Sequence, residues 1–410
     1  MRDDWIETTL GEICKDGLFT DGDWVESKDQ DPEGDYRLLQ LADIGDGAFL
    51  DKSDRWMNKE QFQRLGCTKL EVNDVLIARM PDPIGRACLL PEGLPSSATV
   101  VDVAIVRTGH EILQRILSLI VNSPEFRNEA FSLLTGTTRQ RISRGNLSKI
   151  SFWLPPLPEQ KRIVDLISSV DSYIEALQQQ LESAKNSKSA YVNTIVSEIF
   201  DRGKKTKIAD IAEVKGGKRL PKGTPWSEEP TDHRYIRATD IKDGIVLTEN
   251  LVYVPDDVWP LISRYVVNQG DVVITIAGTI GQVGVIPTSL DGVNLTENAA
   301  RIVVNKELVR SNYLSMLLGS NYYQQDIDSK TKKTTQPKLG LNMINSIEIP
   351  LPDLAEQDEI FSVVSQIDTL IARTNNLILQ TIALRTGLLS DLLSGEHEIP
   401  TSYDKVMGAA

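Results

Sequence analysis

The sequence predicts an α+β protein in which two α/β domains are separated by two long helices that form an antiparallel coiled coil. Three observations support this prediction. The chain repeats itself at an offset of 197 residues. Each copy contains short apolar runs between glycine, proline, asparagine and aspartate residues, and each ends in a long stretch with apolar residues every three or four positions. Two copies of one unit give the chain an internal pseudo-two-fold repeat.

The repeat extends over most of the chain. Residues 35–50, "DYRLLQLADIGDGAFL", align with "DHRYIRATDIKDGIVL" at 232–247. At the same offset "PPLPEQ" (155–160) aligns with "PDLAEQ" (352–357). Matches spread this widely at one offset indicate a duplicated unit.

Each copy divides into a domain and a helix. Short apolar runs predict strands with turns between them, and "HEILQRILSLIVNSPEFRNEAFSLL" (110–134) predicts amphipathic helices late in the first domain. The expected boundaries are a first domain at 1–154, a spacer helix at 155–203, a second domain at 204–349, a second spacer helix at 350–397 and a flexible tail at 398–410.

Both long stretches have helix-start signals. Pro158 suits a first helical position, and Asp353 with Glu356 resembles a capping box. A spacing of four and three residues predicts that these helices pair with each other or with a partner, because one small domain could not cover a helix of roughly 40 residues. The residues expected at these contacts are Ile163, Ile167, Val170, Ile174, Leu177 and Leu181, and in the second helix Ile360, Val363, Ile367, Leu370, Leu377 and Leu384. Val364, Ile371 and Ile378 widen the second stripe.

Composition limits the classes of function. The formal charge of −14 argues against a non-specific nucleic-acid binder, which is usually basic overall. No apolar stretch predicts a membrane span or a signal peptide, so we expect a cytoplasmic protein without a membrane partner. Three cysteines without metal-type spacing predict reduced thiols, and three distant histidines make a metal site improbable.

Basic residues are nevertheless concentrated in acid-free segments at 135–150, 329–347 and 215–226. One such run is usually only a solvated surface. Two runs at equivalent places, each just before a long helix, favour contacts with DNA phosphates and bases. The candidate DNA-binding residues are Thr138, Arg139, Gln140, Arg141, Arg144, Lys149, Lys218, Arg219, Lys222, Lys330, Lys332, Lys333 and Lys338. The equivalent of 215–226 in the first copy is acidic.

Motifs for catalysis are missing. The sequence has no GxSxG, HExxH or P-loop, and no Asn/Asp-Pro-Pro-aromatic tetrapeptide of an adenine methyltransferase. We therefore expect no catalytic residue and no cofactor bound by this chain. An independent nuclease or methyltransferase remains the minority hypothesis. The other alternative is a coiled-coil scaffold whose domains bind protein, which the acidic net charge would suit.

Several motifs together resemble the specificity subunits of type I restriction–modification systems. They are the two Glu-Gln helix starts, "GGKRLPKG", "YIRATDIKDG", "GDVVITIAGTIGQVGVIP", "LTENAARIVV" and "GLLSDLLSGE". The resemblance covers essentially the whole chain.

The resemblance implies two target-recognition domains on a coiled coil that bind a bipartite, asymmetric double-stranded DNA sequence. It also implies two adenine-methyltransferase subunits as partners, which use S-adenosylmethionine, and motor-nuclease subunits, which use ATP and Mg. The DNA-contacting role would fall on loops 137–149, 330–342 and 216–223. "ARMPDPIGR" replaces the glycine loop in the first copy, and its early segment is acidic, so the pattern departs there.

Overall fold

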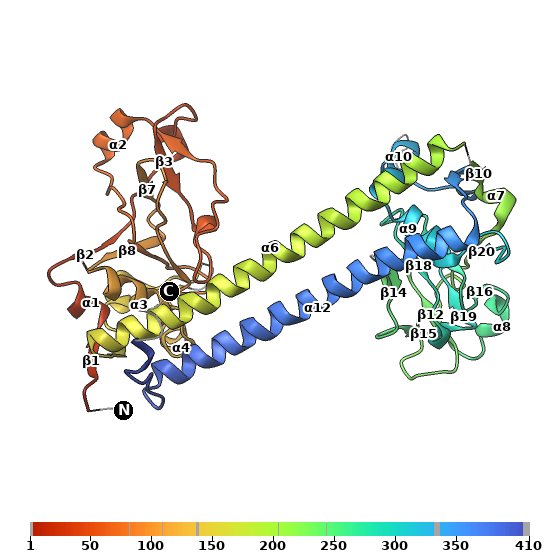
Figure 1. Ribbon diagram of the computed structural model, residues 1–410. Helices are drawn as coiled ribbons and strands as arrows, with labels where there is room; N and C mark the ends of the chain where they lie inside the picture. Colours follow the sequence, from red (N-terminus) through yellow and green to blue (C-terminus); the bar gives the residue numbers. More distant parts are fainter. Residues whose placement is uncertain are drawn as a thin grey trace. The chain divides into compact units, whose positions relative to one another are not determined.

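The computed structural model describes residues 3–81, 83–108, 110–136, 139–203, 205–242, 244–331 and 337–404 (Figure 1). The chain forms two compact units. Unit 1 contains Met1–Leu177 and Leu377–Ala410, and unit 2 contains Gln178–Asn376. The two long helices, α6 (Leu157–Asp201) and α12 (Leu354–Leu393), each contribute one part to either unit. The domain boundaries expected from the sequence lie at the ends of these helices. The boundaries between the two compact units lie instead near the middle of each helix.

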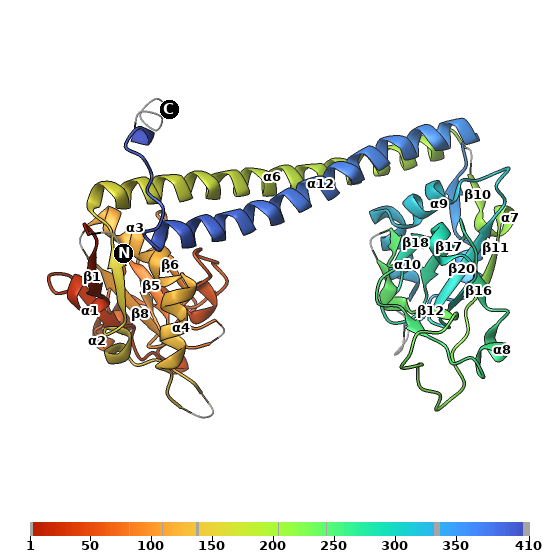
Figure 2. The same ribbon diagram turned by 90° about the horizontal axis from the view of Figure 1, so that it is seen from below.

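Unit 1 contains a four-stranded antiparallel sheet and a three-stranded sheet. The first has the order β2 (Leu18–Asp21), β8 (Val103–Arg107), β5 (Val75–Ala78), β6 (Ala87–Leu89). The second has the order β4 (Trp56–Met57), β3 (Tyr36–Leu39), β7 (Ser97–Thr99), with β3 and β7 parallel. The helices are α1 (Leu10–Ile13), α2 (Lys59–Leu65), α3 (Glu111–Val121), α4 (Pro124–Ser132) and α5 (Arg144–Leu147). Helix α3 packs on β5 and β6 (Figure 2).

Unit 2 repeats this plan. Its antiparallel sheet has the order β11 (Ala212–Gly216), β20 (Ala299–Val304), β17 (Val272–Thr275), β18 (Val283–Val285). Its second sheet has the order β15 (Val252–Tyr253), β12 (Arg234–Ile236), β19 (Val293–Leu295), β16 (Val266–Val267), with β12 and β19 parallel. A hairpin joins β13 (Ile241–Lys242) and β14 (Ile245–Val246). The helices are α7 (Ile208–Ile211), α8 (Trp259–Ile262), α9 (Ser311–Leu318), α10 (Asn321–Thr331) and α11 (Leu341–Asn345). The matching strand orders confirm the internal repeat.

A pair of strands closes each α/β domain. In unit 1, β1 (Ile6–Thr9) pairs antiparallel with β9 (Ser151–Leu154), directly before α6. In unit 2, β10 (Lys205–Lys207) pairs antiparallel with β21 (Glu348–Pro350), directly before α12. Each domain therefore begins and ends on neighbouring strands. Short 3₁₀ helices at Ser27–Asp29, Leu41–Asp43, Ala238–Asp240 and Thr288–Leu290 complete the secondary structure.

The repeated aspartates of the sequence stabilise equivalent turns. Asp43 is buried, and its carboxylate accepts hydrogen bonds from the backbone N–H groups of Gln40 (2.7 Å) and Ser53 (2.7 Å). Asp240 likewise accepts from the N–H of Arg237 at 2.8 Å. Burial raises the pKa of Asp43, but the hydrogen bonds from Gln40 and Ser53 outweigh it, so the net shift is downward.

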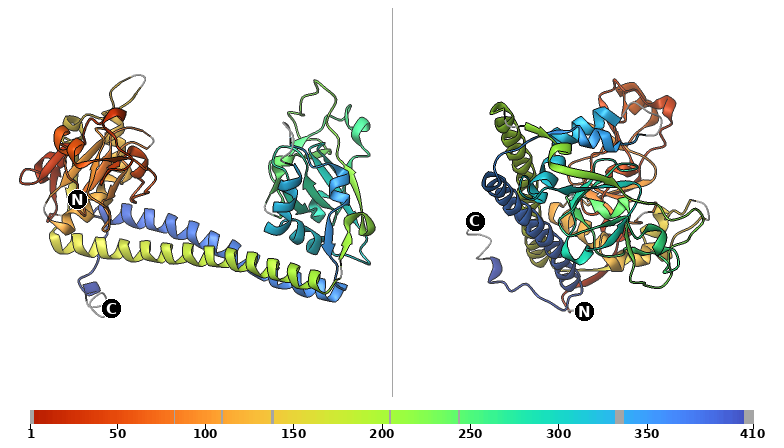
Figure 3. Two further views of the ribbon diagram at one scale, coloured as in Figure 1. Left: turned by 90° about the horizontal axis from the view of Figure 1, so that it is seen from above. Right: turned by 90° about the vertical axis from the view of Figure 1, so that its right-hand side faces the viewer.

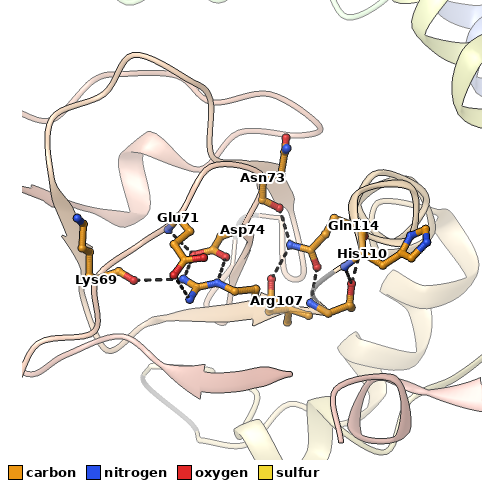
Figure 4. A network of polar contacts seen from close by, with 9 residues as sticks. Lys69, Glu71, Asn73, Asp74, Arg107, His110 and Gln114 are labelled. Atoms are coloured by element: carbon orange, nitrogen blue, oxygen red, sulfur yellow. Dashed lines mark hydrogen bonds and ion pairs between the residues drawn. The ribbon is translucent and has the colours of Figure 1, made fainter. Parts of the chain in front are cut away.

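A second buried aspartate ties a strand to its neighbours in unit 1 (Figure 4). Arg107 on β8 donates to both carboxylate oxygens of Asp74, at 2.7 Å each, and this hydrogen bonding raises the pKa of Arg107. Gln114 on α3 donates to the carbonyl of Asn73 at 2.6 Å and accepts from the N–H of Thr108 at 2.7 Å. The network fixes β8 and α3 against the turn before β5.

The two long helices pair within each unit (Figure 1, Figure 3). In unit 2, Lys188 pairs with Asp368 at 2.5 Å and Arg202 pairs with Glu356 at 2.6 Å. From the first pair to the second, the residue number rises on α6 and falls on α12, so the two helices run antiparallel. In unit 1, Asp171 pairs with Arg385.

Four of the six α6 residues expected at helix contacts are buried, and two of them, Ile163 and Ile167, belong to the core of unit 1. Ile163, Ile167, Ile174 and Leu177 are buried, and Val170 and Leu181 are half-buried.

On α12 the buried residues differ from those expected at four positions. Ile360 is buried and Ile367 half-buried, but four of the expected residues are exposed: Val363 (36%), Leu370 (43%), Leu377 (39%) and Leu384 (66%). Val364 and Ile378, which were expected to widen the stripe, are buried, as are Thr374 and Thr381. The difference arises because α12 carries apolar residues on both sides of the buried line.

The described part of the C-terminal segment packs on unit 1. Ile399 is buried in the same core as Leu389 and Leu392, and Tyr403 packs against that core. Up to residue 404 the segment therefore differs from the flexible tail expected from residue 398, because its apolar side chains find partners; residues 405–410 lie outside the described ranges.

Three free cysteines, Cys14, Cys67 and Cys88, are buried in unit 1. None of the helices in the described ranges combines the length and the apolar character that a membrane crossing needs.

Candidate nucleic-acid interface

The basic segment of unit 1 forms a closed loop between α4 and α5. The N–H of Thr135 donates to the carbonyl of Arg141 at 3.0 Å, and the N–H of Arg141 donates back to Thr135 at 2.9 Å. Arg139 and Gln140 are exposed within this loop, and Thr138 lies outside the described residues. The loop therefore presents a guanidinium and an amide to solvent, the groups that hydrogen-bond base edges and phosphates.

A buried arginine fixes the base of this loop. Arg79 follows β5, and its Nε donates to the carbonyl of Ile142 at 3.0 Å while its own carbonyl accepts from the N–H of Ile142 at 3.0 Å. The guanidinium also donates to the carbonyl of Val101 at 3.2 Å and pairs with Asp21. Burial lowers the pKa of Arg79, although Asp21 opposes this shift. The loop is thus fastened to the sheet at Ile142.

The remaining cations of this segment differ in exposure and in whether an acid pairs with them. Arg141 is half-buried, with Nη1 3.4 Å from a carboxylate oxygen of Asp102, so its charge is partly compensated. Arg144 is exposed, 3.5 Å from the hydroxyl of Thr20. Lys149 is exposed after α5.

The basic segment of unit 2 lies between α10 and α11. Lys330, in the last turn of α10, pairs with Asp326 at 2.5 Å. Lys338 is exposed just before α11. Lys332 and Lys333 lie outside the described residues.

Both basic segments are anchored at equivalent points of the repeat. The N–H of Leu339 donates to the carbonyl of Ile276 at 2.9 Å, as that of Ile142 does to Arg79 at 3.0 Å. Ile276 and Arg79 each directly follow the third strand in the order of their sheet, β17 or β5, and both strands are buried. The fold therefore places the two segments at corresponding sites of the two domains.

The glycine-basic segment of unit 2 follows β11. Lys218 lies over the ring of Tyr265, with Nζ 5.7 Å from the ring centre. Arg219 pairs with Glu297 at 2.6 Å although its side chain is largely exposed, and Lys222 is exposed. A Cβ on Gly217 would lie 2.0 Å from the carbonyl oxygen of Thr296, so only glycine fits there.

The fold adds cations that runs of basic sequence do not reveal. Arg264 and Arg301 come from separate parts of unit 2 and lie with Lys215 around one cavity. Each of the two arginines is isolated among apolar or polar residues in the sequence. No local pattern marks them, because strand pairing alone brings them together. Arg79 was missed for the same reason.

A family model, described as the type I restriction modification DNA specificity domain, matches residues 2–186 and again residues 203–382. The chain belongs to this family. The two matches coincide with the two copies of the sequence repeat, so each copy is one specificity domain.

Members of this family are similar to the chain over most of its length. The MjaVIII specificity subunit of Methanocaldococcus jannaschii is 22% identical, over 97% of this chain and 94% of that protein. The EcoBI specificity subunit of Escherichia coli is 26% identical, over 66% of this chain and 67% of that protein.

Solved structures share the fold. A chain from a study of complex assembly and conformational transition of the type I R-M system has a TM-score of 0.62 at 16% identity, covering 96% of this chain and 98% of that one. The S subunit from M. genitalium has a TM-score of 0.55 at 15% identity, covering 95% of this chain and 96% of that one.

Proposed function

We propose that this chain is the non-catalytic DNA-recognition subunit of a type I restriction–modification complex. The observation that carries the proposal is the equivalence of the two basic segments, each anchored after the same buried strand and each preceding a long helix. Membership of the DNA specificity family supports it. Each domain would place its segment on one part of a divided double-stranded DNA sequence, with phosphate contacts for position and base contacts for specificity.

The two halves of this DNA sequence would differ. The unit 1 segment offers Arg139, Gln140 and Arg144, whereas the described part of the unit 2 segment offers Lys338. Arginine and glutamine make two-point contacts with guanine and adenine, while lysine acts as a point charge. An asymmetric target follows from domains that are alike in fold and different in these side chains.

The exposed residues of α12 give the chain surfaces for partner subunits. Val363 and Leu370 in unit 2, and Leu377 and Leu384 in unit 1, are seven residues apart within each unit and remain exposed. Apolar residues at this spacing suit packing by another helix. Each unit has one such surface, and each surface would bind one adenine-methyltransferase subunit, so the chain would bind two. Motor-nuclease subunits would join through them. S-adenosylmethionine, ATP and Mg would then belong to the partners, and this chain would bind no cofactor.

Genome-wide mapping of N6-methyladenine tests the proposal. The chain is expressed with the methyltransferase encoded beside it, in a host without DNA methylation. We expect a two-part motif with an unread gap, which disappears when this chain is omitted. An assembled complex with an intact methyltransferase but no methylation would instead favour a protein-binding scaffold. DNA affinity that falls steeply with salt would separate the two functions independently.

A further inference from the structure

Unit 2 contains a cavity of about 280 Å³ between β11 and β16. Its wall includes Lys215, Gly216, Gly217, Arg264, Tyr265 and Arg301. Lys218 lies at its edge, over the ring of Tyr265. All of these residues belong to one unit, and four of them carry a positive charge.

The cations around this cavity outnumber the acids that pair with them. Lys215 pairs with Glu213 at 2.6 Å, and Arg301 lies 3.8 Å from Asp271. Over the described part of the chain, no carboxylate pairs with Arg264 or Lys218. The cavity therefore has a local positive excess inside an acidic protein, and such a site attracts an anion.

Arg301 is held in place and still has a donor to offer. Its Nη1 donates to the carbonyl of Val266 on β16, which fixes the guanidinium at the cavity wall. Its Nε is buried and has no hydrogen-bond partner among the described residues. A buried donor without a partner costs free energy unless a ligand or water accepts its hydrogen.

Unit 1 lacks the cations that unit 2 has at this place. Strand register places Lys215 opposite Arg301 in unit 2, and the equivalent pair in unit 1 is Thr20 opposite Ile105. The next turn begins with the N–H of Lys218 donating to the carbonyl of Leu295 at 2.9 Å, and in unit 1 with that of Asp23 donating to Thr99 at 2.7 Å.

The first comparison removes two cations, and the second replaces a lysine with an aspartate. A shared structural need of the fold would have kept the positive charge in both units. The described residues of the first domain therefore do not repeat these three cations.

We propose that this cavity holds a backbone phosphate of the bound DNA, with Arg264, Arg301 and Lys218 as its ligands. Guanidinium groups bind phosphate through parallel N–H donors, and an ammonium group adds a point charge. The inference rests on the proposed function. It adds an anchoring site that fixes the second domain on the duplex, next to the segment of Lys218, Arg219 and Lys222, and it predicts no equivalent in the first domain.

The test measures DNA affinity of the complete complex against KCl concentration, with a duplex that contains the mapped target. Because a contact with one phosphate releases about one counterion, the double variant Arg264→Gln/Lys218→Gln should lower the slope of log affinity against log salt by about 1. Binding should weaken roughly tenfold, and the two single variants should fall short of additivity because they share one phosphate. Lys306→Gln removes one positive charge from unit 2 outside the cavity lining, as each single variant does within the site, and should leave the slope unchanged.

A loss of folding would not imitate this result. Among the described residues no carboxylate pairs with Arg264 or Lys218, so neither change leaves an acid without its partner, and thermal unfolding should match that of the parent chain. A double variant with the parent's slope would overturn the proposal. So would inorganic phosphate that binds the complex at this cavity and leaves DNA affinity unchanged, which would assign the site to a free anion. If the parent complex does not bind DNA at all, the proposed function fails first and the inference fails with it.

Discussion

The guanidinium of Arg385 on α12 faces the carboxylate of Asp171 on α6 through two nitrogen–oxygen contacts, the Nη2–Oδ2 distance being 2.9 Å. This two-point contact holds one register of the antiparallel helices in unit 1, because sliding either helix by one turn would separate the groups by about 5.4 Å.

Removing either partner should weaken the pairing of the helices in unit 1. Asp171→Asn and Arg385→Met should each lower stability by about 1 kcal/mol, since both side chains remain partly exposed and water screens the pair. A double-mutant cycle on thermal unfolding measures the coupling, and the exchanged pair Asp171→Arg/Arg385→Asp should restore much of it. Glu182→Gln, in an exposed pair with Lys185 at 3.8 Å, is the control with little effect. Strictly additive effects would show that Asp171 and Arg385 act independently.

The stability of unit 1 should fall above about pH 9. Burial raises the pKa of Cys14 to about 11 and that of Cys67 and Cys88 to about 12, from an ordinary value of 9.0. Above pH 9 the unfolded chain loses thiol protons that the folded chain keeps, so stability is full below this pH and falls as the pH rises toward 11–12. Thermal unfolding between pH 7 and 10 measures this. Native thiols should resist a thiol reagent at pH 8 and all react in denaturant; rapid native labelling would contradict the assigned burial.

The two repeated aspartates should be of similar importance. Asp43→Asn should destabilise unit 1 by about 1–3 kcal/mol, because an amide replaces a buried carboxylate that accepts backbone hydrogen bonds. The lowered pKa means that Asp43 contributes stability above its unfolded pKa and loses it as the pH falls through the folded value. The variant should therefore show a weaker acid dependence, measured by urea unfolding between pH 3 and 7. Asp240→Asn tests the matching turn in unit 2, and an unchanged acid dependence of Asp43→Asn would exclude this role.

Replacing two adjacent glycines, Gly216 and Gly217, by alanine should change the stability by very different amounts. Gly217→Ala would place a Cβ 2.0 Å from a backbone carbonyl oxygen, which cannot move without shifting β19, whereas the Cβ of Gly216→Ala would meet only the Leu341 side chain at 3.8 Å. We expect a loss of a few kcal/mol for the first change and about 0.5 kcal/mol or less for the second. Thermal unfolding of the two variants gives the comparison, and equal midpoints would contradict it.

The exposed and buried sides of α12 should separate docking from folding. Leu377→Ser/Leu384→Ser should leave thermal unfolding within about 0.5 kcal/mol per site of the parent and weaken binding of the purified methyltransferase. The neighbouring Ile378→Ser removes a buried side chain and should cost about 2–4 kcal/mol. Methyltransferase binding is followed by size-exclusion chromatography. If the double variant binds like the parent, the partner uses another surface.

The spacing of apolar residues predicted the elements that depend on one segment of the chain. It did not predict which residues of α12 are buried, because that depends on two segments packing together. The duplicated unit and both long helices follow from the sequence, because each is marked by a pattern within one segment. On α12 apolar residues flank the contact line on both sides. Whether Val363 or Val364 is buried depends on the opposing helix, which no pattern within α12 encodes.

The same limit applies to the candidate interface. Runs of basic residues indicated segments such as 137–149, because those cations are neighbours in the sequence, although Arg144–Leu147 of that segment form α5. Arg264 and Arg301 meet only after β16 and β20 take their places in two sheets, and Arg79 gains its role from a loop that begins more than fifty residues later. The composition of one sequence segment does not indicate such contacts between distant residues.

The closing strand pairs have a consequence for how these domains can change. The second domain leaves the helices at β10 and returns at β21, and these strands lie side by side. A domain attached at a single place can be exchanged as a block, as insertions at closely spaced termini are tolerated. Recombination that keeps the β10–β21 pair could bring in new reading loops and leave the helical frame intact, and β1 with β9 gives the first domain the same property. With the proposed function, such modularity would let a new sequence preference arise in one step.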